Sequence, residues 1–165
     1  MKTLYIIRHA KSSWGDSGLD DFDRPLNERG EKDAPRMGKR LKEKEVTADL
    51  MISSTAKRAL KTCKAVAAIL EYPEEKIKEE KKLYHADEEQ ILSILKNIKD
   101  PNEVVIIFGH NPGFTEFANN LLNENIMNIP TTGVVAGKLN IHSWKDIKFG
   151  CGELLFFDFP KNKND

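Results

Sequence analysis

The sequence predicts an α/β fold in which helices cover both faces of a mostly parallel mixed sheet. Three short, mostly apolar runs, at 3–8, 49–53 and 103–108, have the length and composition of buried strands. Each run is followed along the chain by a segment whose apolar residues recur at helical spacing. Because alternating strands and helices are typical of a sheet between two helical layers, we expect a three-layer α/β/α sandwich.

A long loop and then a helix follow the first predicted strand. Residues 8–24 show no regular period and contain Gly15 and Gly18, which favours a loop, and long loops in compact domains are often functional. Asn27 is a suitable N-cap for the next helix. The apolar face of that helix contains Ala34, Met37, Gly38 and Leu41.

Three more helices are predicted further along the chain. One spans 55–71, another begins at Asp87 or Glu88, and the last follows the turn at 109–113. The charge run at 74–82 fits either a solvated face or an edge strand.

The last predicted strands, at 133–141 and 153–159, are expected to pair antiparallel at one end of the sheet. No repeat, linker or low-complexity stretch divides the chain, and 165 residues is the usual size of one compact domain. We therefore expect a single domain over 1–160, followed by a disordered polar tail at 161–165.

Composition argues against several classes of function. Lys plus Arg and Asp plus Glu number 26 each, so the formal net charge is zero, which disfavours broad capture of nucleic acid or anionic membrane. Neither Cys63 nor Cys151 has another Cys or a His at metal-ligand spacing. No apolar stretch has the length of a membrane span or a signal peptide. We expect a monomeric cytoplasmic protein.

Chemically active side chains follow three of the predicted strands. The first strand delivers Arg8 and His9, the second is followed by Arg58, and the third by His110. Ligands of such sheets bind beyond the carboxyl ends of the strands. Arginine forks match phosphate oxygens, and a neutral imidazole can attack phosphorus to form a covalent intermediate. Each residue alone fits a structural role, but their conjunction at one sheet edge favours phosphoryl transfer.

Four motifs resemble those of the histidine phosphatase superfamily. They are Arg8-His9-Ala10, the Pro-Leu-Asn segment at 24–30, the Ser-to-Thr helix start at 53–62, and Gly109-His110-Asn111-Pro112. Together they are specific and span most of the chain. The resemblance implies a phosphoglycerate mutase-like fold and no metal or organic cofactor.

The resemblance also implies roles for individual residues. His9 is expected to be the nucleophile that becomes phosphohistidine, and Arg8, Arg58 and His110 to complete the phosphate pocket. Asn111 and Ser12 are weaker candidates for lining that pocket.

Among the branches of the family, the compact chain most resembles the SixA-type phosphohistidine phosphatases. Little chain lies between Arg58 and His110 to build the lid and general acid of larger members. An alkoxide leaving group benefits from a positioned acid, whereas imidazole is far less basic and can leave once protonated. The expected partner is therefore a protein carrying phosphohistidine.

Two alternatives stay open at this point: a small-molecule phosphomonoesterase with the same pocket, and a non-catalytic phosphoprotein-binding module. An acid near the leaving group would favour the esterase, and Asp87 is the candidate, although a helix N-cap is the simpler interpretation. Residues 131–133 fit either the pocket rim or a plain turn.

Overall fold

The structure is a computed structural model that describes residues 1–14 and 18–162, and its centre is a six-stranded sheet. The strand order is β3-β2-β4-β1-β5-β6. The first four strands of this order are parallel, and β5 runs antiparallel to both β1 and β6. The bounds are β1 (Lys2–Arg8), β2 (Leu50–Ser53), β3 (Lys78–Glu79), β4 (Val104–Gly109), β5 (Val134–Leu139) and β6 (Gly152–Asp158).

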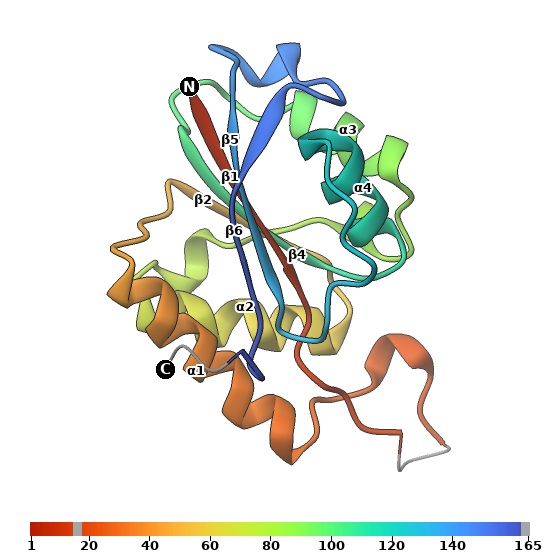
Figure 1. The fold of residues 1–165 in the computed structure, drawn as a ribbon. Coiled ribbons are helices and arrows are strands. Elements are labelled where there is room, and N and C mark those ends of the chain that lie inside the picture. The colour runs from red at the N-terminus through yellow and green to blue at the C-terminus, as the bar shows by residue number, and fades with distance from the viewer. Residues whose placement is uncertain (15–17, 163–165) are drawn as a thin grey trace.

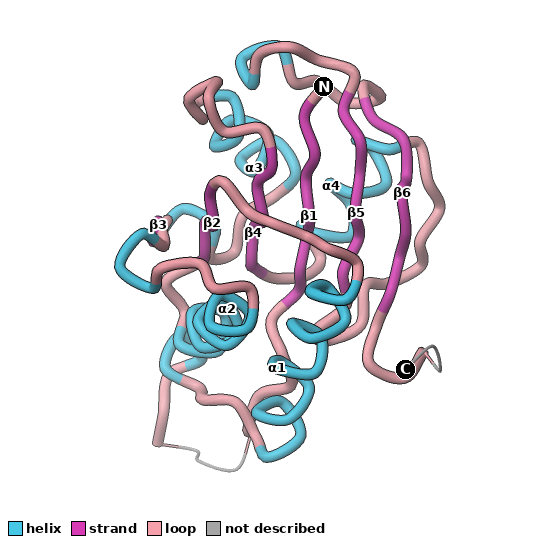
Figure 2. Tube along the Cα trace, turned by 90° about the vertical axis from the view of Figure 1, so that its left-hand side faces the viewer, coloured by secondary structure: helices cyan, strands magenta, loops and turns pink. Residues whose placement is uncertain are grey.

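Helices cover both faces of the sheet, as the sequence predicts (Figures 1 and 2). Helices α1 and α2 lie on one face, and α3 and α4 on the other. The helices are α1 (Glu28–Glu43), α2 (Lys57–Ile69), α3 (Glu88–Lys96) and α4 (Gly113–Leu122), with short 3-10 turns η1 (Asp21–Asp23), η2 (Glu74–Lys76), η3 (Lys81–Leu83) and η4 (Trp144–Asp146). None of the helices in the described ranges is long and apolar enough to cross a membrane.

Alternate residues of the central strands pack into two separate cores. Leu4 and Ile6 of β1 pack with α3 and α4, whereas Tyr5 and Ile7 pack with α1 and α2. A central strand is thus buried on both faces, which is why β1 and β4 read as nearly continuous apolar runs.

Several local predictions are confirmed. The Asn27 side chain accepts a hydrogen bond from the Gly30 N–H at 2.9 Å and caps α1. The last two strands pair antiparallel, and the edge strand β3 lies within the charge run at 74–82. Of the predicted loop at 8–24, residues 15–17, with Gly15, lie outside the described residues; the rest contains η1.

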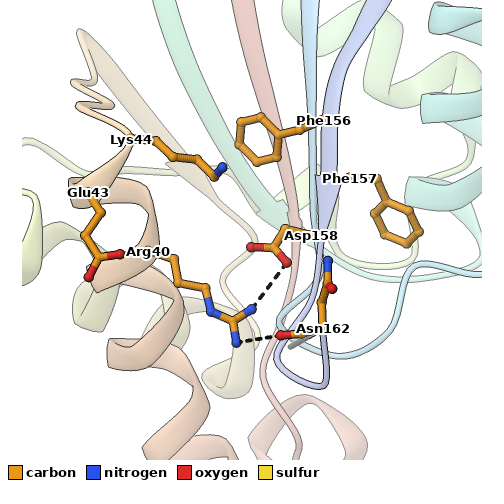
Figure 3. Close-up of a pocket in the computed structure, with 7 residues that line it drawn as sticks. All are labelled: Arg40, Glu43, Lys44, Phe156, Phe157, Asp158 and Asn162. Atoms are coloured by element: carbon orange, nitrogen blue, oxygen red, sulfur yellow. Dashed lines mark hydrogen bonds and ion pairs between the residues drawn. The ribbon is translucent and has the colours of Figure 1, made fainter. Parts of the chain in front are cut away.

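After β6 the chain turns back onto α1 (Figure 1), where the buried Arg40 holds it. The Arg40 guanidinium donates to the Asp158 carboxylate at 3.2 Å (Figure 3). It also donates to three backbone carbonyls, those of Phe159, Pro160 and Asn162. The tail predicted at 161–165 is described only as far as Asn162, and residues 163–165 lie outside the described part.

Candidate active site

His9 is the first residue after β1 and lies at the carboxyl edge of the sheet. Its ring Nδ1 is 2.7 Å from the Ala10 carbonyl oxygen. Because a carbonyl oxygen only accepts hydrogen bonds, Nδ1 carries the proton, and Nε2 of the neutral ring keeps a free lone pair. The His9 N–H donates to the Gly109 carbonyl at 3.0 Å, which ties this turn to the end of β4.

The His9 ring is held in its neutral form. Burial is the main cause that lowers the pKa of His9, to about 3, and the charges of Arg58, Arg8 and Arg24 act in the same direction. The hydrogen bond to Ala10 acts in the opposite direction but is outweighed. A neutral imidazole keeps the lone pair that nucleophilic attack requires.

Thr62 of α2 fastens the turn after His9 to the helix that carries Arg58. The Ala10 N–H donates to Thr62 Oγ1 at 2.9 Å, and that hydroxyl donates to the Arg58 carbonyl at 2.8 Å. Thr62 is fully buried. Thr62 ends the motif at 53–62, but no role was predicted for it from the sequence. Its spacing of one helical turn from Arg58 is the signal that could have revealed one.

His110 follows β4 and faces His9, with 5.2 Å between the two ring centroids. Its Nε2 is 2.8 Å from Ser54 Oγ, which also accepts a hydrogen bond from the Ala56 N–H at 3.2 Å. Burial, followed by the neighbouring His9, Arg58 and His85, lowers the pKa of His110 to about 2. His110 is therefore also neutral at physiological pH.

Arg8 ends β1, and Arg58 lies in the first turn of α2. Arg8 Nη1 donates to the Ile129 carbonyl at 3.0 Å. Arg58 Nη1 and Nη2 donate to the carbonyl oxygen and carboxylate of Asp21 at 2.6 and 3.0 Å. Burial, and then the charge of Arg58, lowers the pKa of the Arg8 guanidinium, so two cations lie close together beside His9.

Thr132 stands beside this turn, where β5 is about to begin. Its N–H donates to the carbonyls of Arg8 and His9 at 3.1 and 3.0 Å. Its φ is +60°, which is costly for a β-branched residue, and such strain clusters at functional sites. Of the two interpretations of 131–133, the structure favours the pocket rim.

Four buried polar atoms in this region lack a hydrogen-bond partner within residues 1–14 and 18–162. They are Arg8 Nε, Arg58 Nε, His110 Nδ1 and Thr132 Oγ1. Buried polar atoms without partners are rare in native proteins. Arginine N–H groups beside a neutral histidine suit the oxygens of a small anion, and phosphate fits that description.

The other predicted pocket residues make structural hydrogen bonds. Asn111 Nδ2 donates to the Ile129 carbonyl at 2.9 Å, and its Oδ1 accepts from Thr115 Oγ1 at 2.8 Å. Ser12 is buried, and its hydroxyl accepts a hydrogen bond from Arg24. These contacts hold the loops that surround Arg8 and His9.

Asp87 is exposed and caps α3. Its side chain accepts from the Gln90 N–H at 2.8 Å, and the Gln90 side chain accepts from the Asp87 N–H at 2.9 Å. This reciprocal pair is a capping box, which confirms the N-cap interpretation.

Sequence reasoning missed Asp21, which joins several site residues. One carboxylate oxygen accepts from the Tyr84 hydroxyl at 2.6 Å and from Arg58, and the other from Arg24 Nε at 3.0 Å. Burial favours the neutral acid, but Tyr84, Arg58 and Arg24 outweigh it and hold the pKa of Asp21 well below its usual range. Nothing in the local sequence distinguishes Asp21 from Asp20 or Asp23, because the fold of the loop selects it.

Comparison with known proteins agrees with this geometry. The family model of the histidine phosphatase superfamily (branch 1) matches residues 4–87, which include Arg8, His9 and Arg58. The chain belongs to this superfamily. An uncharacterised protein of Mycobacterium tuberculosis is 29% identical over 167 residues, covering 94% of this chain and 100% of that protein.

Solved structures share the fold of this chain. The SixA protein of Agrobacterium tumefaciens superposes with a TM-score of 0.80 at 26% identity, over 96% of this chain and 98% of that one. The protein histidine phosphatase SixA in complex with tungstate superposes with a TM-score of 0.81 at 19% identity, over 96% and 97% of the two chains. Within the described residues, no group of three His, Cys, Asp or Glu side chains could hold a metal ion.

Proposed function

We propose that this chain is a phosphatase that removes the phosphoryl group from phosphohistidine in proteins through a covalent intermediate on His9. One observation carries the proposal: the Ala10 carbonyl fixes the His9 tautomer, so that Nε2 offers its lone pair beside Arg8, Arg58 and His110. A phosphoryl group at Nε2 would supply oxygens for those nitrogens of these three residues that have no partner in the described part of the chain.

In the first step, His9 Nε2 attacks phosphorus and the bond between phosphorus and the leaving nitrogen breaks. Arg8 and Arg58 neutralise the phosphoryl charge as it spreads over the equatorial oxygens. Ser54 Oγ accepts from Ala56, and its own O–H can donate to His110 Nε2, so that His110 Nδ1 carries a proton toward a phosphoryl oxygen. A substrate phosphoimidazole protonated on its other nitrogen leaves as neutral imidazole.

In the second step, water attacks phosphorus and the bond to His9 Nε2 breaks. Because Nδ1 keeps its proton, the intermediate is itself a protonated phosphoimidazole. Its electron pair returns to Nε2, which regenerates neutral His9, and the protons of the water leave with inorganic phosphate. The Ala10 carbonyl thus stabilises the charged ring of the intermediate.

The state of the nearby carboxylates favours a substrate whose leaving group needs no general acid. Asp87 is exposed and engaged in its capping box, and Asp21 is held ionised by its neighbours. Neither is suited to protonate an alkoxide. Phosphohistidine, with its weakly basic leaving group, is the substrate that this arrangement fits.

The test compares turnover of a protein phosphorylated on histidine with turnover of phenyl phosphate and a sugar phosphate, in the presence of a metal chelator. We expect fast release from phosphohistidine, slow release from the esters, and loss of both in His9→Ala. Faster release from the sugar phosphate would instead assign the chain to the small-molecule phosphatases. Binding of vanadate without turnover of any substrate would assign it to the non-catalytic phosphoprotein-binding modules.

A further inference from the structure

We infer that Asp21 is a specificity-determining residue that makes the site discriminate against leaving groups carrying negative charge. The inference rests on the proposed phosphatase function and deepens it, since it concerns the group attached to the phosphoryl rather than the phosphoryl itself.

The first observation is how Asp21 holds Arg58. Its carbonyl and carboxylate accept hydrogen bonds from both terminal nitrogens of the guanidinium, at 2.6 and 3.0 Å. This leaves the Nε edge, which has no partner within the described residues, for a phosphoryl oxygen. Asp21 therefore orients the arginine without competing for the edge that a phosphoryl group would use.

The second observation is that the carboxylate is fixed and lies toward solvent. The Tyr84 hydroxyl donates to it at 2.6 Å, and Arg24 Nε at 3.0 Å, so two further side chains restrain it. The Asp21 side chain is 40% exposed, against 5% for Arg58. The cation thus lies deep in the site and the anion at its solvent-exposed mouth.

The third observation is the charge balance. Three arginines, Arg8, Arg24 and Arg58, act electrostatically on His9, and both site histidines are neutral. With Asp21 ionised, these groups carry a net charge of two positive units, which matches a phosphoryl dianion. A carboxylate or second phosphate on the leaving group would find no compensating cation among them and would face Asp21. A neutral or protonated imidazole would not be repelled.

The test uses two esters that differ by one remote charge, phenyl phosphate and 4-carboxyphenyl phosphate. In wild type we expect kcat/KM to be higher for phenyl phosphate. High salt should reduce that preference, because it screens the charge of the Asp21 carboxylate at the mouth of the site. Asp21→Asn keeps an acceptor for Arg58 but removes the charge. It should raise the ratio of carboxyphenyl to phenyl turnover by about fivefold.

The matched control is Asp23→Asn, which removes an exposed charge from the same 3-10 turn and should leave the ratio unchanged. An unchanged ratio in folded Asp21→Asn, or equal and salt-independent wild-type turnover of the two esters, would overturn the inference. The wild-type comparison requires no variant to fold. Failure of the proposed function looks different, because turnover would then be absent, independent of His9, or faster with a sugar phosphate than with phosphohistidine.

Discussion

At the scale of single residues, the site depends on hydrogen bonds that fix the protons of two histidines. The Nδ1–H of His9 donates to the Ala10 carbonyl, and the backbone N–H of Ala10 donates to the Thr62 hydroxyl. Ala10 therefore links the tautomer of His9 to helix α2 through two separate backbone groups. Small changes around Ala10 are expected to affect chemistry and stability together.

Thr62→Val should show this coupling. The valine has nearly the same shape but leaves the buried Ala10 N–H without an acceptor, which costs about 1–3 kcal/mol of unfolding free energy. We expect kcat to fall as well, because the turn bearing His9 loses its attachment. Thr62→Ser, measured beside it by denaturant unfolding and steady-state kinetics, should recover both. Full activity in Thr62→Val would mean that Thr62 acts in packing alone.

The histidines also predict how stability depends on pH. The folded pKa values of His9 and His110 are about 3 and about 2, whereas both titrate near 6.5 in the unfolded chain. Below about pH 6.5 these histidines bind protons in the unfolded state but stay neutral in the native state. The free energy of unfolding therefore falls as the pH falls. His9→Gln should show a shallower fall between pH 7 and pH 5 in urea unfolding experiments. The same slope in both proteins would show that His9 is not held neutral.

At the scale of elements, helix and strand ends determine what reaches the site. Parallel strands β1, β2 and β4 end at one edge, which is why Arg8, His9, Arg58 and His110 could be predicted to meet there. The C-terminal part of α1, which contains Arg40, has a structural role. Arg40 donates hydrogen bonds to Asp158 at the end of β6 and to the segment that follows it, and so attaches the edge strand β6 to α1 (Figure 3).

Arg40→Met tests that attachment. Removing one partner of a buried ion pair leaves the Asp158 carboxylate uncompensated, so we expect a loss of about 3 kcal/mol in unfolding free energy. The kcat of the folded protein should be unchanged, because the Arg40 partners described above are Asp158 and the segment that follows it. Lys39→Met, at the neighbouring exposed position, should alter neither quantity. A large change in kcat with retained stability would contradict this structural role.

At the scale of the whole molecule, the layered fold was predictable because its central strands are buried on both faces and read as apolar runs. The residues of the candidate site were predictable because Arg8, His9 and His110 lie at strand ends, and Arg58 lies in the first turn of the helix after β2. Asp21 and Tyr84 were not, since they meet across 63 positions of sequence in a loop region without periodicity. Their pairing follows from tertiary structure, and no local pattern encodes it. The extent of the domain, set at 1–160, stays a prediction.

The measurement that tests the central claim most directly is to trap the enzyme during turnover and locate the phosphoryl group. The protein is quenched in alkali, which preserves phosphohistidine, and then examined by peptide mass spectrometry and phosphorus NMR. We predict phosphate on Nε2 of His9, because Nδ1 is committed to the Ala10 carbonyl, and no trapped phosphate in His9→Ala. Phosphate on another side chain, or sustained turnover by His9→Ala, would contradict the account.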